Sequence, residues 1–289
     1  MTLERMERTF RVSVAALAFR KLDGATAIAA GALIIVAWTL VALFAPILAP
    51  HDPMATDLSA VLKPPLTPGH WLGTDRLGRD VLSRIIFATR VDLSMGLIGV
   101  TAPFLIGTII GLNAGYLGGV VDTFLMRLLD VALAFPFFVL VLAIVGILGP
   151  GLINYYIALA IVAWVPYTRL VRAEVLVLRR KEFVEAAQVL GFSRTHIMIR
   201  HVLPNAISPA VVFLMTDIVL TILLGSALSF FGMGAQPPTP EWGRMIAEGK
   251  AFLATAWWMS VFPGITLILM ALGFSLLGDG LAKQLRVRV

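Results

Sequence analysis

The chain has 289 residues, of which 59% are hydrophobic and 14% are charged, and its mean hydropathy is +0.92. This composition excludes an ordinary soluble domain and indicates an all-α polytopic membrane protein. We therefore take the net charge of +6 as a guide to topology and not as a sign of nucleic-acid binding, and the absence of cysteine excludes disulfides and thiolate metal sites.

Uncharged stretches of about 20 residues, the length needed to cross the hydrocarbon core, predict about six membrane spans. The first is too long for the apolar region of a signal peptide, so we expect it to remain as a membrane helix. Gly149-Pro150-Gly151 divides one long uncharged run into the third and fourth spans. The predicted spans cover residues 27–48, 93–121, two segments within 131–168, 208–231 and 257–277.

A polar segment, residues 51–92, separates the first two predicted spans. We divide the chain after it, into residues 1–92 (N-terminal tail, first span and external segment) and residues 93–289 (five-helix core). Six spans place both termini on one side of the membrane. That side holds 16 of the 23 Lys and Arg residues, so the positive-inside rule predicts cytoplasmic termini and a cytoplasmic loop over about 171–205.

This loop contains a short amphipathic helical pattern. Phe183, Ala186, Ala187 and Leu190 are spaced at i, i+3, i+4 and i+7, which places them on one helical face, and Gly191 follows as a candidate C-terminal cap. A helix of about eight residues is marginal in water, so we expect a partner protein or the membrane domain itself to support it.

Two features of the spans suggest specific roles. Glycines recur every four residues at 107, 111, 115 and 119, a pattern typical of close helix packing in lipid. Asp217 is the only charged residue well inside a predicted span, and such residues line a translocation path or form a structural pair.

Three segments resemble ABC importer permeases. Glu185-Ala186-Ala187, then Gly191, then His201-Val202-Leu203-Pro204 is similar to their EAA loop, with His201 in place of Ile. The stretch His70 to Arg84 resembles the GTDxLGRDxxSR motif of dipeptide, oligopeptide and nickel permeases, and Leu228 to Gly234 resembles their LSFLGLG segment. The C-type subunit, with a type I ABC importer permease fold, is the nearest likeness.

The resemblance implies a multi-pass protein of the bacterial inner membrane, working with a homologous second permease, two ATPase subunits and an extracytoplasmic binding protein that delivers a peptide-like substrate. ATP and Mg would bind the ATPases, since this chain lacks G-x-x-x-x-G-K-[ST]: Gly249-Lys250 precedes Ala251, and Arg244 replaces the first glycine. The chain would be non-catalytic and without a cofactor. The implied ATPase contacts are Phe183, Glu185, Ala186, Ala187, Leu190 and Gly191. Ser193 is expected to cap a following helix, which Leu203-Pro204 would end.

The external motif is expected to brace that face or to contact the binding protein or the second permease. Its residues are Gly73, Asp75, Gly78, Arg79, Asp80 and Arg84. The four-residue spacing of Asp80 and Arg84 predicts a helical ion pair. The four histidines show no ligand spacing, so we expect no metal site.

Alternatives stay open at this point. The same architecture could import nickel, opines or glutathione. An ion-driven carrier would be expected to show two repeated halves and mid-membrane residues that bind the coupling ion. An intramembrane enzyme is disfavoured, because the chain has neither H-E-x-x-H nor G-x-S-x-G.

Overall fold

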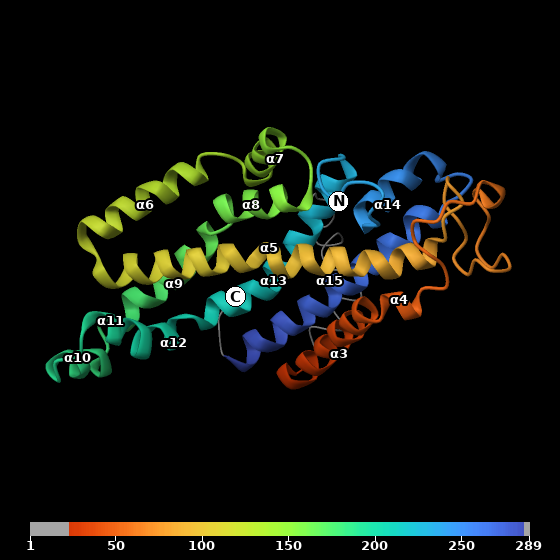
Figure 1. The fold of residues 1–289 in the computed structure, drawn as a ribbon. Coiled ribbons are helices and arrows are strands. Elements are labelled where there is room, and N and C mark those ends of the chain that lie inside the picture. The colour runs from red at the N-terminus through yellow and green to blue at the C-terminus, as the bar shows by residue number, and fades with distance from the viewer. Residues whose placement is uncertain (1–22, 286–289) are drawn as a thin grey trace, which may run out of the picture.

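The computed structural model describes residues 23–285, and every named element in this part of the chain is a helix. The longest helix, α5 (Val81–Leu117), runs along most of the molecule, from the 51–80 segment at one end towards α10 (Glu182–Val189) at the other (Figure 1). The predicted all-α fold is confirmed.

The other helices pack along α5 or extend from its two ends, with one exception. They are α3 (Gly24–Leu43), α4 (Ala45–Leu48), α6 (Gly119–Leu133), α7 (Phe137–Leu148), α8 (Leu152–Val162), α9 (Val165–Leu178), α11 (Arg194–Ile197), α12 (Leu203–Ala206), α13 (Ser208–Phe230), α14 (Trp242–Gly249) and α15 (Trp258–Gln284). The exception is α7, which packs on α8.

Four described helices, α3, α5, α13 and α15, are long and apolar enough to cross a membrane. The pair α6 and α7 would make a fifth span, bent by 82°. The shorter helices α8 and α9 meet at Ala163 and Trp164, so neither reaches the length of a span alone. The six-span count and the cytoplasmic termini stay predictions, and residues 1–22 and 286–289 lie outside the described residues.

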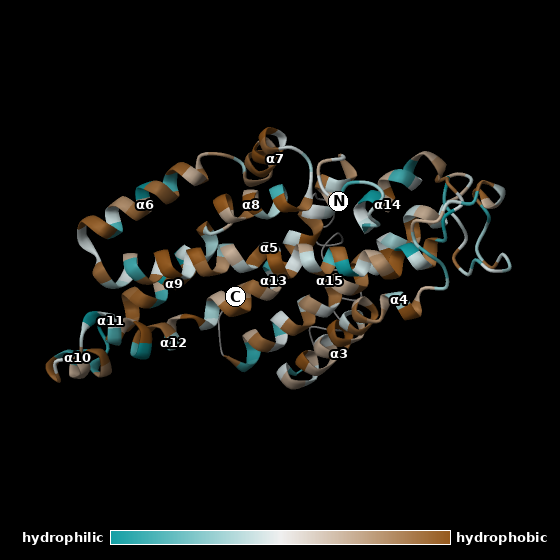
Figure 2. Cartoon of the chain, viewed as in Figure 1, coloured by the Kyte–Doolittle hydropathy of each residue, from teal (hydrophilic) through white to brown (hydrophobic). Residues whose placement is uncertain are grey.

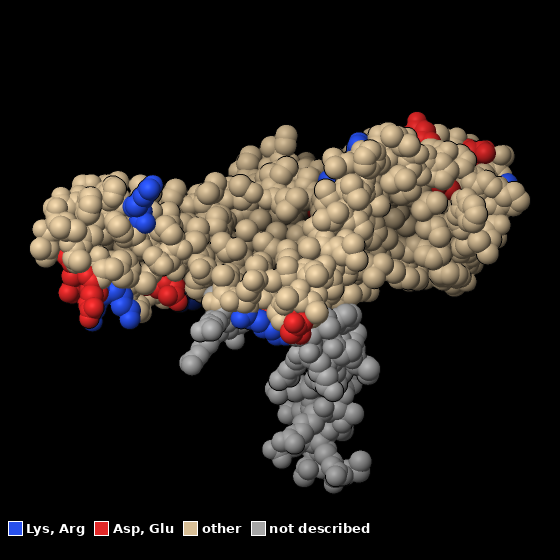
Figure 3. All heavy atoms as spheres, turned by 90° about the horizontal axis from the view of Figure 1, so that it is seen from below, with Lys and Arg blue, Asp and Glu red and all other residues tan. Residues whose placement is uncertain are grey.

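Polarity follows the same long axis. Hydrophilic residues are frequent in the 51–80 segment and around α10 to α12, whereas α3, α7 and α13 are mainly hydrophobic (Figure 2). On the face in Figure 3, charged side chains gather around α10, beside the start of α3 and towards the opposite end, with mainly uncharged surface between them. This distribution suits a chain whose middle lies in lipid.

The second span begins earlier than predicted. Helix α5 starts at Val81, because Asp80 caps it by accepting a hydrogen bond from the Ser83 N–H (2.8 Å). The polar segment therefore ends at residue 80, and a division after residue 92 falls inside α5. The helix also includes Arg84 and Asp92, so Asp217 is not the only charged residue in a long helix. These two side chains are 1% and 0% exposed, which means that protein surrounds them and not lipid.

Glycines on α5 allow α9 to approach closely. A Cβ atom added to Gly107 would lie 2.5 Å from the Trp164 carbonyl oxygen, and one added to Gly111 would lie 2.7 Å from that of Thr168. A Cβ atom added to Gly115 would lie 2.8 Å from the Cβ of Val175. The predicted packing role is confirmed for these three glycines and wrong for Gly119, which starts α6 and has no heavy atom within 4 Å of an added Cβ.

Gly111→Val is expected to destabilise the protein by about 1–3 kcal/mol, because added carbons must push α9 away from α5. The thermal midpoint of the purified protein in detergent measures the effect. Gly146→Ala in α7 is the control, since nothing lies within 4 Å of its added Cβ and alanine favours helix. Equal midpoints for the two variants would contradict close packing at Gly111.

Candidate functional site

The predicted amphipathic helix is confirmed as α10, an eight-residue helix whose bounds match the helical pattern. Gly191 follows with φ +82°, a left-handed conformation that glycine adopts without strain. The Gly191 N–H donates to the Gln188 carbonyl (3.0 Å) and the Phe192 N–H to that of Ala187 (3.2 Å). This is the glycine cap that the sequence predicts.

The two sides of α10 have different surroundings. Val184 and Ala187 are 0% and 4% exposed and pack into a cluster with Ile197 and Val202. The side chains of this cluster come from α5, from every helix between α9 and α13, and from the turn after α11, so the membrane domain supports the helix. Ala187 therefore belongs to the internal support, and its predicted contact with a partner does not fit its burial.

Apart from Val184 and Ala187, the residues of α10 are exposed. Phe183 is 42% exposed and Leu190 is 76% exposed, and Glu185 and Ala186 are exposed as well. Neighbouring Val189 extends the apolar surface, with 88% of it exposed. An exposed apolar surface on a helix that packs on its own domain through other residues is typical of a docking element.

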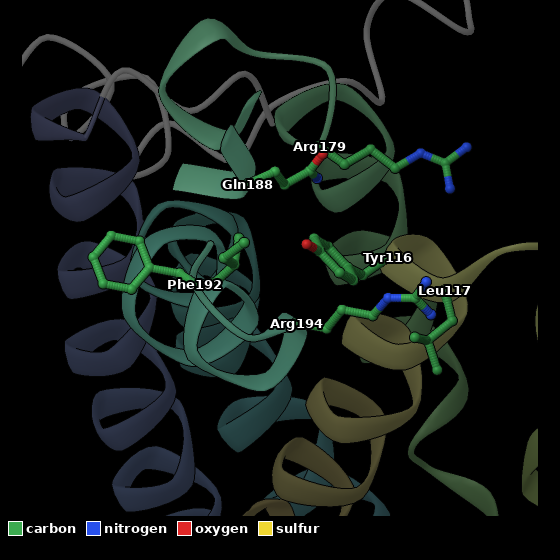
Figure 4. Close-up of a pocket in the computed structure, with 7 residues that line it drawn as sticks. Tyr116, Leu117, Arg179, Gln188, Phe192 and Arg194 are labelled. Atoms are coloured by element: carbon green, nitrogen blue, oxygen red, sulfur yellow. The ribbon is translucent and has the colours of Figure 1, made fainter. Parts of the chain in front are cut away.

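A polar pocket of about 460 Å³ opens beside α10. Its lining includes Tyr116 at the end of α5, Gln188 of α10 and two arginines, Arg179 and Arg194 (Figure 4). Arg179 also donates to the Gly115 carbonyl (2.9 Å), near the C-terminus of α5. The pocket thus places positive charge next to the exposed apolar surface.

The segment after α10 differs in part from the prediction. Ser193 caps α11 as expected, accepting from the His196 N–H (3.3 Å). Leu203 and Pro204 do not end the helical segment, because a π-helical turn, residues 198–202, leads directly into α12. The missing N–H of Pro204 is tolerated since the residue lies in the first turn of α12.

Asp217 has a partner that the sequence does not reveal. The Tyr167 hydroxyl on α9 donates to its carboxylate (2.7 Å), and Tyr167 packs edge-on against Phe104 and Phe213. The structure therefore contains a structural pair at Asp217. Its predicted place on a translocation path stays a prediction.

The external motif forms a buried ion-pair network. Asp75 accepts from the Arg79 side chain (Nε to Oδ2, 2.6 Å), and Arg79 donates to Glu248 of α14 (2.8 Å). Arg84 lies 3.7 Å from both carboxylates. The predicted pair of Asp80 with Arg84 is wrong, because Asp80 folds back to cap α5 while Arg84 points towards Glu248.

Two glycines shape this network. Gly73 and Gly78 have φ values of +78° and +73°. A Cβ on Gly78 would collide with the Asp57 carbonyl oxygen, and one on Gly73 would lie 2.5 Å from that of Lys63. Both positions therefore favour glycine for space and for conformation.

The structure also brings together residues that the sequence leaves apart. The rings of His51 and His70 lie 5.0 Å apart beside Asp80, although the positions of the two histidines in the sequence show no ligand spacing. Asp92 of α5 and Glu241, the N-cap of α14, both accept from Ser226, at 3.4 Å and 3.1 Å. Burial raises the pKa of the Glu241 carboxyl. A spacing of about 150 residues carries no sequence signal for such contacts.

Known proteins resemble the chain over most of its length. The family model described as binding-protein-dependent transport system inner membrane component matches residues 107–289, and the model for the N-terminal membrane domain of oligopeptide transport permease C matches residues 15–65. The chain is 41% identical to the probable D,D-dipeptide transport system permease protein DdpC of Escherichia coli K12, over 91% of this chain and 88% of that protein.

Two further relatives have similar identity. The dipeptide transport system permease protein DppC of Alkalihalophilus pseudofirmus is 41% identical over 93% of this chain and 88% of its own length. The glutathione transport system permease protein GsiD of Escherichia coli O6:K15:H31 is 41% identical over 89% of this chain and 85% of its own. The family resemblance is thereby confirmed, and the chain belongs to the family of binding-protein-dependent transport system inner membrane components.

Proposed function

We propose that this protein is one of two permease subunits of an ATP-driven importer of di- or oligopeptides, and that α10 transmits the movements of separate ATPase subunits to the spans. Its family and its apolar helices make it a multi-pass protein of the bacterial inner membrane. Dipeptide permeases among its relatives support the peptide substrate, and the glutathione permease supports a modified tripeptide as the second candidate.

The observation that carries the proposal is that α10 is packed on the membrane domain through part of its surface and exposed over the rest. Val184 and Ala187 hold the helix on the membrane domain, whereas neighbouring Phe183 and Leu190 stay exposed. Burying a phenylalanine and a leucine in a partner contributes about 1.5–3 kcal/mol each. That energy is sufficient to hold a short helix in a groove of an ATPase subunit.

Polar groups around the helix support the same contact. The exposed Glu185 carboxylate can accept hydrogen bonds from basic or amide groups of a partner. Arg179 and Arg194 in the adjacent pocket suit acidic side chains or carbonyl oxygens. Docking would thus combine an apolar centre with polar contacts at its edge, as in other specific interfaces.

The energy source follows from what the sequence lacks. The chain has no phosphate-binding G-x-x-x-x-G-K-[ST] motif, so ATP and Mg would be held by partner chains. A second permease would complete the pathway, and an external binding protein would deliver the substrate.

The proposal is tested by reconstituting the chain in liposomes with its second permease, ATPases and binding protein. We expect uptake of a labelled dipeptide that requires both ATP and the binding protein. Glutathione, a nickel chelate and an opine serve as competitors and rank the substrate classes. Uptake driven by an ion gradient without ATP would contradict the proposal and favour a secondary carrier.

A further inference from the structure

Two histidines and an aspartate meet at the end of the molecule opposite α10. His51 follows α4, His70 lies in the 51–80 segment, and Asp80 precedes α5. Their three potential ligand atoms lie within 4.8 Å of one another. The His70 Nδ1 is 3.0 Å from Asp80 Oδ1, and the His51 Nδ1 is 3.9 Å from Asp80 Oδ2.

The carboxylate of this cluster is held in a fixed position. Asp80 Oδ2 accepts from the Ser83 N–H (2.8 Å) and from the Ser83 hydroxyl (2.7 Å), and only 2% of the Asp80 side chain is exposed. The backbone N–H of His51 donates to the Ser83 hydroxyl (3.0 Å), which fixes the His51 backbone beside the carboxylate. Outer hydrogen bonds that orient a ligand in this way are typical of protein metal sites.

Access to the cluster is open on one side. The side chain of His51 is 42% exposed and that of His70 is 17% exposed, so an ion can enter from solvent past His51. In a tetrahedral zinc site with bonds of about 2.0–2.1 Å, neighbouring ligand atoms lie about 3.4 Å apart. The His70 and His51 nitrogens lie 3.0 Å and 3.9 Å from different oxygens of Asp80, and the three ligand atoms lie within 4.8 Å of one another, so rotation of the exposed His51 ring would bring them to the spacing of a zinc site.

We propose that His51, His70 and Asp80 bind one Zn²⁺ ion, with water in the fourth position. Two imidazole nitrogens and one carboxylate suit zinc and other late transition metals, whereas Mg²⁺ and Ca²⁺ prefer ligands that are all oxygen. The ion would tie the end of the first membrane helix and the 51–80 segment to the start of α5. This site is independent of α10 and of the proposed substrate.

A simpler interpretation is a hydrogen-bonded histidine and aspartate that close the segment without metal. The His70–Asp80 distance of 3.0 Å allows such a bond. The two interpretations differ in the number of zinc ions bound per chain. Only the zinc site requires His51 and one tightly held ion.

Zinc binding is measured on the full-length protein in detergent, stripped with chelator and titrated with Zn²⁺ alone. We expect one ion per chain, and we expect His51→Ala and His70→Ala each to weaken binding by more than about tenfold. Asp80→Asn is expected to do the same while keeping the helix cap, since asparagine caps as well as aspartate. A variant with unchanged affinity would overturn the proposal.

The matched control is the double variant His196→Ala and His201→Ala. Those rings lie 5.7 Å apart, but no carboxylate completes a three-ligand group with them among residues 23–285. The control should keep one ion per chain, and its loss of zinc would overturn the assignment. If the variants fail to fold, chemical modification of histidines in the wild-type protein tests the site instead. Zn²⁺ should protect His51 and His70 from diethyl pyrocarbonate and leave His196 reactive. Equal modification with and without zinc would refute the site.

Discussion

Leu190→Asp is expected to reduce ATP-driven uptake by more than about tenfold while the protein still inserts into the membrane. Leu190 is 76% exposed in the chain, so the change costs its own fold little. At an interface with an ATPase, it would remove about 1.5–3 kcal/mol of apolar burial and force a carboxylate out of water. Since 1.4 kcal/mol is about a factor of ten in affinity, assembly should fail first.

The measurement combines uptake by the reconstituted importer with co-purification of the ATPase subunits on a tagged permease. Leu66→Asp is the control, because Leu66 is also a leucine with 80% of its side chain exposed, in the 51–80 segment at the opposite end from α10. Its φ of +65° is one that aspartate tolerates. If Leu190→Asp kept normal uptake and normal ATPase assembly, α10 would pack on its own membrane domain alone.

The helical fold could be predicted because long apolar runs in this chain have few alternatives in lipid. The start of α5 could not be predicted, since the sequence does not distinguish buried charged residues such as Arg84 and Asp92 from solvent-exposed ones. The break at Ala163 and Trp164 was also hidden, because both residues continue an apolar run. Hydropathy reports how polar a residue is but not what surrounds it.

In the candidate site, features set by neighbouring residues could be predicted, and contacts between residues far apart in the sequence could not. The extent of α10 and the glycine cap after it depend on neighbouring residues, and both predictions are confirmed. Which residues of α10 are buried depends on Ile197 and Val202, so the resemblance implied an ATPase contact for Ala187 although it is buried. Likewise the second partner of Arg79, beside Asp75, is Glu248, 169 residues away, and no spacing rule reaches that far.

The second large effect is expected for Glu248→Leu in this ion-pair network. The side chains of Arg79 and Arg84 are 6% and 2% exposed, and Asp75 alone would remain to balance them. Removing one partner from a buried ion pair costs about 3–5 kcal/mol, because it leaves a buried charge uncompensated. We expect the thermal midpoint in detergent to fall by roughly 10 °C.

Two comparisons isolate the cause of that loss. Asp130→Asn removes a charge from the exposed pair of Arg127 and Asp130, whose side chains are 80% and 60% exposed, and should change stability by less than about 1 kcal/mol. Adding Arg79→Met to Glu248→Leu should cost less than the sum of the two single variants, since the unpaired arginine is removed as well. Strictly additive losses would show that Glu248 stabilises α14 by packing and not by its charge.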